Sequence, residues 1–465
     1  MARLFGTDGV RGLANGDLVT PELALALARS AAAELLTGWS GPGRPMAVIG
    51  RDTRPSGPML QAAAAAGFAS VGVDVRLLGV VPTPLVAHAC ATGRAQLGLV
   101  ISASHNPMPD NGLKLFDGAG HKLADSVEDA IAARLAAGGP GNGARAVGDQ
   151  VGRIAVEAAE EVAAYTGHLL ATLTAPLAGL RVVVDCAQGA ASTIAPDVYR
   201  RGGATVVSLH ADGDGQRINE DCGATHLGSL QAAVVAHGAD LGLAHDGDAD
   251  RCLAVDASGR IVDGDQILAI CARGLAARGA LPTQTVVATV MSNLALHHAM
   301  DRAGIGVVTT DVGDRYVLEA MRAGGHALGG EQSGHLVFGD LATTGDGLLT
   351  GLALLDRMAS TGHTLAELAS VVVPLPQVLV NVPAPRERAG AADVLDAVAA
   401  QERALGGSGR VLLRASGTEP LVRVMVEAPT AEVARQVADL LADVVAPTRV
   451  LRVDRPADGA AVEQT

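Results

Sequence analysis

Aromatic and basic residues are both scarce in this chain of 465 residues. It contains 1 Trp, 3 Tyr and 4 Phe, and its 35 Lys and Arg are outnumbered by 49 Asp and Glu, which gives a formal net charge of -14 at pH 7. A nucleic-acid-binding surface needs basic stripes and usually aromatic stacking platforms. The composition therefore argues against a nucleic-acid partner.

Cysteine is scarce as well, and the five cysteines form no CxxC pair: Cys90, Cys186, Cys222, Cys252 and Cys271. An odd, scattered set indicates neither a disulfide framework nor a zinc site. The segment that follows Met1 lacks the apolar core of a signal peptide, and no uninterrupted apolar run approaches the ~18 residues that a membrane span needs. We therefore expect a cytoplasmic protein without a membrane partner.

A weak internal repeat organises the first three quarters of the chain. In each copy a short β-branched run is followed by a helical stretch and a second such run: 46–50 with 72–75, 181–185 with 203–207, and 285–288 with 304–308. Such runs are typical of βαβ units whose parallel sheet is buried on both faces. The sequence thus predicts α/β architecture, with three related α/β domains in tandem and mixed, mostly parallel sheets.

The C-terminal part has a different pattern. Strand-like runs at 377–382, 410–413 and 421–426 alternate with helical stretches, and a final amphipathic helix follows Thr430 as its N-cap. This predicts a fourth, α+β domain after a Pro-rich linker at 373–376. We place the four domains at residues 1–152, 153–255, 256–370 and 375–455.

The hexapeptide Ser102-Ala103-Ser104-His105-Asn106-Pro107 follows the strand-like run 97–101. Pro107 fixes its own φ and disfavours a helical Asn106, so Ser104 lies on a stiff turn at the carboxyl end of a strand. Ligands gather at those ends in open α/β sheets. Ser104 is therefore a candidate phosphoryl carrier, although the hexapeptide alone also fits an ordinary turn.

A second loop places Asp246, Asp248 and Asp250 at alternate positions after the strand-like run 241–244. Three carboxylates at such short spacing repel one another unless a cation binds between them. Hard oxygen ligands suit Mg²⁺, Mn²⁺ or Ca²⁺ rather than zinc. An EF-hand is excluded because its sixth and twelfth positions hold Arg251 and Ala257. A solvated acidic turn is the alternative interpretation.

Two further loops carry polar groups that suit a sugar phosphate. Residues 329–335 form a glycine-bracketed loop with a carboxylate, an amide, a hydroxyl and an imidazole. Residues 414–420, with Arg423 beyond them, join two guanidinium groups, hydroxyls and a glycine, which together suit a phosphate dianion. Since the chain has no GxxxxGK motif, that phosphate does not belong to a P-loop nucleotide.

These four loops, one in each predicted domain, closely resemble the α-D-phosphohexomutase family over nearly the whole chain. Segments 3–12, 330–335 and 343–347 resemble its amino-sugar members. The resemblance implies that Ser104 becomes phosphorylated and joins Asp246, Asp248 and Asp250 around one Mg²⁺. It also implies further catalytic residues, namely Arg11, His105, Lys114, Arg251 and His335. Glu331 and Ser333 would read the sugar, and the phosphate-binding residues would be Arg414, Ser416, Gly417, Thr418 and Arg423.

The resemblance further implies an isomerase that interconverts glucosamine 6-phosphate and glucosamine 1-phosphate and feeds cell-wall precursor synthesis. A sugar 1,6-bisphosphate would be its intermediate and activator, and a homodimer is possible. One alternative is a phosphomannomutase or phosphoglucomutase, although Gln332 favours the amino sugar. A Mg²⁺-dependent phosphatase and a sugar-phosphate-binding regulator are rivals from other functional classes.

Overall fold

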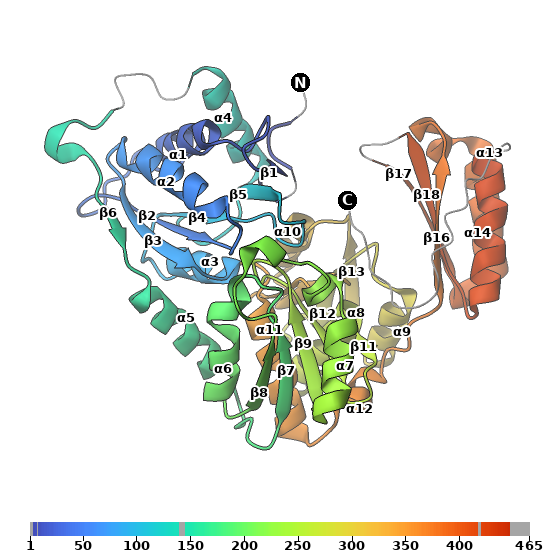
Figure 1. Cartoon of the computed structure of the whole chain (residues 1–465). Helices are drawn as coiled ribbons and strands as arrows, with labels where there is room; N and C mark the ends of the chain where they lie inside the picture. The colour runs from blue at the N-terminus through green and yellow to red at the C-terminus, as the bar shows by residue number, and fades with distance from the viewer. Residues whose placement is uncertain (1–2, 7, 139–144, 417–419, 447–465) are drawn as a thin grey trace. The chain divides into compact units, whose positions relative to one another are not determined.

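The structure, a computed structural model, describes residues 3–6, 8–138, 145–416 and 420–446 (Figure 1). They form two compact units. The first contains the described residues up to Met291 and those from Gly304 to Val371, and the second contains Ser292–Ala303 and those from Val372 onward. No helix in these described ranges is long and apolar enough to cross a bilayer.

The first sheet has six strands, in the spatial order β1 (Val10–Leu13), β5 (Asp110–Phe116), β4 (Leu97–Ile101), β2 (Met46–Arg51), β3 (Asp74–Val80) and β6 (Ile154–Val156). Its central strand β4 is buried along its whole length, as a continuous apolar run between two helical layers requires. The helices of this region are α1 (Pro21–Leu35), α2 (Gly57–Ala69), α3 (Thr83–Ala91) and α4 (Asp125–Ala136). Helix α1 begins after Thr20, whose side chain accepts a hydrogen bond from the Leu23 amide.

The second sheet has the order β11 (Ile261–Val262), β10 (Cys252–Asp256), β9 (Leu241–His245), β7 (Arg181–Asp185) and β8 (Thr205–Leu209). The third has the order β13 (Gly306–Thr310), β12 (Thr285–Thr289), β14 (Leu328–Gly330) and β15 (Leu336–Phe338). The helices around them are α5 (Ala159–Ala171), α6 (Ala195–Arg201), α7 (Gly228–His237), α8 (Gly264–Ala277), α10 (Asp314–Gly324), α11 (Gly347–Thr361) and α12 (Leu365–Ala369).

The three sheets share one topology. Each contains two neighbouring parallel strands, a third parallel strand, and an antiparallel strand that returns beside the third: β3-β2-β4-β5, β8-β7-β9-β10 and β13-β12-β14-β15. This shared order confirms the predicted repeat. In each copy, the loop that joins the third parallel strand to the antiparallel strand is one that the sequence predicted to carry catalytic or binding residues.

The second unit is built on an antiparallel sheet in the order β16 (Gln377–Pro383), β18 (Leu421–Glu427) and β17 (Arg410–Ala415). Its helices are α9 (Leu294–Arg302), α13 (Ala392–Leu405) and α14 (Ala431–Val445). Val378, Val424 and Val426 of the sheet share a core with Ala434 and Leu441 of α14. As predicted, Thr430 is the N-cap of α14, and its side chain accepts a hydrogen bond from the Val433 amide.

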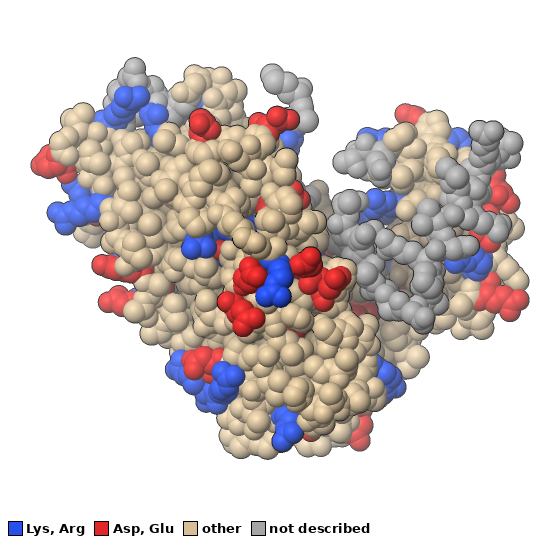
Figure 2. Space-filling view, viewed as in Figure 1, with Lys and Arg blue, Asp and Glu red and all other residues tan. Residues whose placement is uncertain are grey.

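Four sheets in this arrangement confirm the predicted fold class. The exact domain boundaries stay predictions, and the edge strands β6 and β11 lie just beyond the expected ends at 152 and 255. On the face shown in Figure 2, acidic and basic side chains are interspersed.

Candidate active site

Ser104 lies in the first of the three equivalent loops, between β4 and β5, and faces the second. Its Oγ donates a 2.6 Å hydrogen bond to Asp246 Oδ2 in the loop between β9 and β10. Ser104 is buried and has a left-handed backbone with φ of 52°, which is uncommon for a residue other than glycine. The structure therefore brings the predicted nucleophile and the acidic loop into direct contact.

Ser102 supports the turn rather than sharing the role of Ser104. Its Oγ accepts the Ser104 amide at 2.9 Å and donates to Asp52 Oδ2 at 2.6 Å. Asp52 in turn forms a fully buried ion pair with Arg54, with 2.9 Å between Oδ2 and Nε. The sequence reasoning missed Asp52 and Arg54, although they directly follow β2, the strand that pairs with β4.

Asp246, Asp248 and Asp250 are buried, and one oxygen from each lies within 4.8 Å of the others. Asp248 Oδ1 and Asp250 Oδ1 are buried, and within the described ranges neither accepts a hydrogen bond, although His335 Nδ1 and Arg251 Nε approach Asp250 Oδ1 to 3.6 Å and 4.0 Å. Buried carboxylate oxygens without donors are costly unless a cation satisfies them. The donor set therefore fits a hard divalent ion such as Mg²⁺.

The pKa values of these aspartates also favour a bound cation. Burial and then repulsion from Asp250 and Asp248 raise the pKa of Asp246 to about 8. Burial opposes ionisation of Asp250 too, but Lys114 and His335 outweigh it and hold the pKa of Asp250 below its usual value. The three carboxylates are thus crowded enough to hold a proton on Asp246 when no cation is bound.

Lys114 is buried on β5 and points at the acidic loop. Its Nζ lies 2.7 Å from Asp248 Oδ2, 2.8 Å from Asp8 Oδ2 and 3.6 Å from Asp250 Oδ2. Burial lowers the pKa of Lys114, but the three carboxylates raise it by more. In this arrangement the side chain is an ammonium group, which contributes positive charge to the site.

His335 lies in the third loop, between β14 and β15, and is buried. Its Nδ1 is 3.6 Å from Asp250 Oδ1, and its Nε2 is 3.5 Å from Asp314 Oδ2 and 3.2 Å from the Gly345 amide. Burial opposes the imidazolium form, but Asp250 and Asp314 raise the pKa of His335 above its ordinary value. The histidine is therefore poised to hold a proton beside the acidic loop.

Arg11, Arg251 and His105 line the same region. Arg11 pairs with Asp8 and donates from Nη1 to the Ala103 carbonyl at 3.4 Å. The Arg251 amide donates to Asp246 Oδ1 at 3.3 Å. His105 Nδ1 is 3.3 Å from Ser104 Oγ, and burial followed by the charges of Arg251 and Arg11 lowers the pKa of His105 to about 4.

The structure describes most of the residues predicted to bind the sugar and its phosphate. Glu331 accepts the Gly313 amide at 3.2 Å, while Ser333 Oγ is buried with no hydrogen-bond partner in the described ranges. In the second unit, Arg414 and Arg423 are directly opposite each other on β17 and β18, and Ser416 is buried. Gly417 and Thr418 lie outside the described residues.

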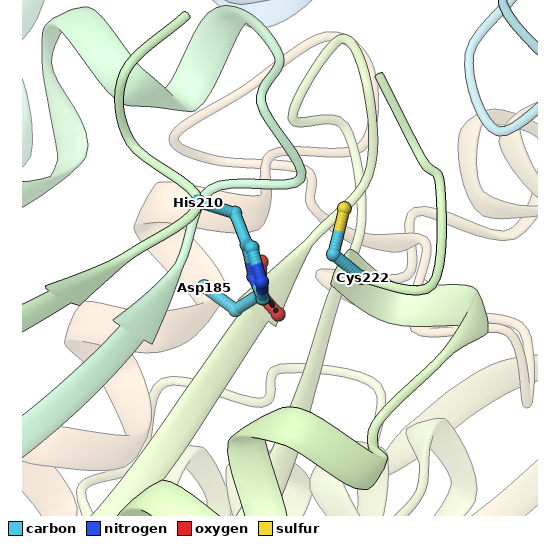
Figure 3. Close-up of side chains that lie close together, drawn as sticks. All are labelled: Asp185, His210 and Cys222. Carbon is cyan, nitrogen blue, oxygen red and sulfur yellow. Dashed lines mark ion pairs between the residues drawn. The ribbon is translucent and has the colours of Figure 1, made fainter. Parts of the chain in front are cut away.

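A different cluster in the second sheet region brings Asp185, His210 and Cys222 together (Figure 3). His210 Nδ1 is 3.0 Å from Asp185 Oδ2, and the carboxylate also accepts the Ala187 amide at 2.9 Å and the Gly223 amide at 3.0 Å. Sequence reasoning gave no role to these three residues. Their contacts anchor the loops that follow β7 and β8.

Four family models match the chain, all described as Phosphoglucomutase/phosphomannomutase. They are alpha/beta/alpha domain I at residues 2–140, domain II at 163–259, domain III at 263–374 and the C-terminal domain at 379–444. A phosphoglucosamine mutase of Frankia casuarinae is 63% identical over 453 residues, which cover 96% of this chain and 98% of that protein.

Two solved structures show the fold at lower identity. A phosphoglucomutase/phosphomannomutase family protein from Burkholderia thailandensis has a TM-score of 0.79 and 24% identity, covering 96% of this chain and 98% of that one. Aspergillus fumigatus N-acetylphosphoglucosamine mutase in complex with GlcNAc-6P and magnesium has a TM-score of 0.60 and 19% identity, covering 95% of each chain.

Proposed function

We infer the reaction from one premise: the chain belongs to the phosphoglucomutase/phosphomannomutase family, whose four domain models it matches. We propose that it is an isomerase that interconverts glucosamine 6-phosphate and glucosamine 1-phosphate. The near full-length identity to a phosphoglucosamine mutase supports the amino sugar as substrate. The contact between Ser104 Oγ and Asp246 is the single structural observation that carries the mechanism.

In the forward direction, phospho-Ser104 transfers its phosphoryl group to the 1-hydroxyl of glucosamine 6-phosphate. The bond between phosphorus and Ser104 Oγ breaks, a bond from phosphorus to the sugar oxygen forms, and the hydroxyl proton passes to a base of the enzyme. The product is glucosamine 1,6-bisphosphate. Ser104 Oγ, protonated at the end of this transfer, meets the 6-phosphoryl group after the intermediate turns end over end. The bond from phosphorus to O6 then breaks, a bond from phosphorus to Ser104 Oγ forms, the Oγ proton passes to O6, and glucosamine 1-phosphate remains.

The residues around Ser104 fit the charge that develops during this transfer. Asp246, Asp248 and Asp250 would hold Mg²⁺, which when bound neutralises negative charge on the transferring phosphoryl oxygens. Lys114, Arg11 and Arg251 add fixed positive charge around the same loop. Buried, preoriented groups of this kind need little rearrangement as charge builds up.

We propose that His335, rather than Lys114, is the base that takes the proton of the sugar hydroxyl. Three carboxylates keep the Lys114 ammonium protonated in this arrangement. Carboxylates also raise the pKa of His335, but they raise it from an ordinary value near neutrality, so its imidazole can still exchange a proton at a pH where Lys114 stays charged. Glu331 and Ser333 would read the sugar hydroxyls.

The phosphate that does not react is proposed to bind to Arg414, Ser416, Gly417, Thr418 and Arg423. The cross-strand pairing of Arg414 on β17 with Arg423 on β18 supports this assignment, since Arg presents paired donors to a phosphate. We also propose a cytoplasmic location, because all five cysteines are free thiols, as a reducing compartment favours. The homodimer stays a prediction.

The test compares turnover of glucosamine, glucose and mannose 6-phosphates side by side, with Mg²⁺ and a catalytic amount of the matching 1,6-bisphosphate. We expect the highest kcat/KM with glucosamine 6-phosphate and no turnover by Ser104→Ala. Preference for mannose or glucose phosphate would assign the chain to the alternative activity. Release of inorganic phosphate without any 1-phosphate product would indicate a phosphatase.

A further inference from the structure

The backbone carbonyls of the Ser104 turn are held from two sides by side chains to which no catalytic role has been given. Asn219 Nδ2 donates to the Ser104 carbonyl at 2.8 Å and to the Asn106 carbonyl at 3.0 Å. Arg54 Nη2 donates to the same two oxygens, at 3.0 Å and 2.7 Å. Four donated hydrogen bonds therefore converge on two carbonyl groups that flank His105.

The two side chains come from different sheet regions of the first unit. Arg54 follows β2 and is fully buried, with its charge balanced by Asp52. Asn219 lies between β8 and α7, in the region of the second sheet, and is 7% exposed. Besides the bond from Ser104 Oγ to Asp246, Asn219 is thus a second contact between the region that carries the acidic loop and the turn that carries the nucleophile.

The backbone of Asn219 is linked through Ala187 to Asp185, one of the three residues drawn in Figure 3. Asp185 accepts the Ala187 amide, and the Ala187 carbonyl accepts the Asn219 amide at 3.0 Å. Asn219 has a left-handed backbone with φ of 60°, a conformation that asparagine tolerates better than most residues. The chain of contacts runs from the carboxyl end of β7 to the Ser104 carbonyl.

The acidic loop packs against the same carbonyl group. A Cβ atom added at Gly247 would lie 2.5 Å from the Ser104 carbonyl oxygen and 3.1 Å from Asn219 Nδ2. Gly247 stands between Asp246 and Asp248, so the nucleophile turn, the Asn219 amide and the acidic loop meet at one point. The Ser104 carbonyl belongs to the same residue as the Oγ that donates to Asp246, so the contacts that hold the carbonyl also help to place the Oγ.

We propose that Asn219 is a positioning residue for phosphoryl transfer, which acts by holding the Ser104 and Asn106 carbonyls so that Ser104 Oγ stays aligned with the acidic loop. The role rests on the proposed function, because it presumes that Ser104 carries the phosphoryl group. Positioning of this kind affects the transfer step, since small displacements of a reacting atom slow a reaction strongly. It has little effect on how tightly the sugar binds.

The experiment uses the full chain and follows the phosphoryl group by intact mass. Wild type, Asn219→Asp and Asn219→Ala are loaded with glucose 1,6-bisphosphate and Mg²⁺, then mixed with an excess of hexose phosphate and quenched at intervals. Asn219→Asp keeps the shape of the side chain but replaces the donor with an acceptor that faces two carbonyls. We expect its single-turnover transfer to be slower by at least about tenfold, and that of Asn219→Ala to fall between it and wild type.

Asn15→Asp is the matched control, because Asn15 is also left-handed, with φ of 56°, but exposed. It should transfer at the wild-type rate. Substrate affinity and the Mg²⁺ concentration for half-maximal rate should change little in the Asn219 variants.

The proposal is overturned if both Asn219 variants transfer at the wild-type rate per folded molecule, even where their thermal midpoints fall, since that pattern indicates a purely structural role. If wild type itself gains no phosphoryl group on Ser104, the proposed function and this proposal fail together. If wild type is loaded and the variants match it, only the positioning role fails.

Discussion

At the scale of single residues, the structure separates the two serines of the nucleophile turn by their hydrogen bonds. Ser102 Oγ donates a hydrogen bond to Asp52 and accepts one from the Ser104 amide, while Ser104 Oγ donates to Asp246. The sequence pattern alone could not distinguish them, because both serines lie in the same six residues. The resemblance to a known family singled out Ser104, and the structure supplies the physical reason, because the partners Asp52 and Asp246 come from segments far apart in the chain.

Thr83 is another residue whose role comes from a distant partner. It is the first residue of α3 and fully buried, its Oγ donates to Asp248 Oδ2 at 2.7 Å, and its amide donates to the Asp248 carbonyl at 2.9 Å. These bonds leave Asp248 Oδ1 as the oxygen without a donor from the described residues. Thr83 therefore orients a proposed metal ligand without itself reaching the metal.

We predict that Thr83→Val weakens Mg²⁺ binding by about tenfold, as is typical when a residue that orients a metal ligand is lost. Valine keeps the shape and removes the hydroxyl donor. The measurement is the Mg²⁺ dependence of the transfer rate, together with Mn²⁺ binding followed by electron paramagnetic resonance. Thr92→Val, at the exposed C-terminal end of the same helix, is the control. An unchanged half-saturating Mg²⁺ concentration in Thr83→Val would contradict the idea.

At the scale of elements, the sequence predicted the central parallel strands of the repeats and the three antiparallel strands of the second unit, but it missed the antiparallel strand β5. Strands β4 and β7 were predicted with their observed bounds because continuous β-branched runs buried on both faces leave a clear pattern. Strand β5 was not predicted, since its buried residues include the polar Asn111 and Lys114, which break the apolar pattern. Asn219 was missed for a related reason: its partners are backbone carbonyls, and these leave no trace in side-chain spacing.

Helix α9 is tied to the C-terminal sheet by a buried carboxylate. Glu427, at the end of β18, is fully buried, accepts two 3.0 Å bonds from Arg410 on β17, and accepts the Leu294 amide at 2.8 Å. A carboxylate beside the first turn of a helix also interacts favourably with the helix dipole. Together with the bond from Arg410 to the Ser292 carbonyl and the bonds between Asn293 and Leu375, this contact joins residues 292–303 to the second unit.

We predict that Glu427→Ala lowers the stability of the second unit by about 3 kcal/mol, because it leaves a partly buried guanidinium and a helix N-terminus without their carboxylate. Hydrogen exchange should accelerate at the first turn of α9 and along β17. Glu432→Ala, at an exposed position on α14, should leave those amides as they are in wild type. Equal protection in Glu427→Ala and wild type would show that the carboxylate does not hold α9.

At the scale of the whole molecule, the repeat places the three chemical loops at equivalent positions in the three sheets. Because the three sheets share a topology, each presents the same loop at the carboxyl end of its third parallel strand. The first copy carries Ser104, the second Asp246, Asp248 and Asp250, and the third His335. Local runs in the sequence predict the repeat, but residue patterns do not show that these loops meet, since that depends on how the sheets pack within the first unit. Only the resemblance implied that Ser104 joins the three aspartates.

The last prediction concerns removal of the metal. Since Asp246, Asp248 and Asp250 all belong to the first unit, Mg²⁺ should stabilise that unit alone, by about 2.7 kcal/mol at one hundred times its dissociation constant. Hydrogen exchange before and after chelation should show slower exchange with Mg²⁺ at β9 and β10 and no change at β16 to β18. Asp248→Asn should lose most of the effect.

Because the pKa of Asp246 is raised to about 8 without metal, protons compete with Mg²⁺ below that pH, and the stabilisation should grow as the pH rises from 6.5 to 8.5. Equal stabilisation of both units would place the ion elsewhere.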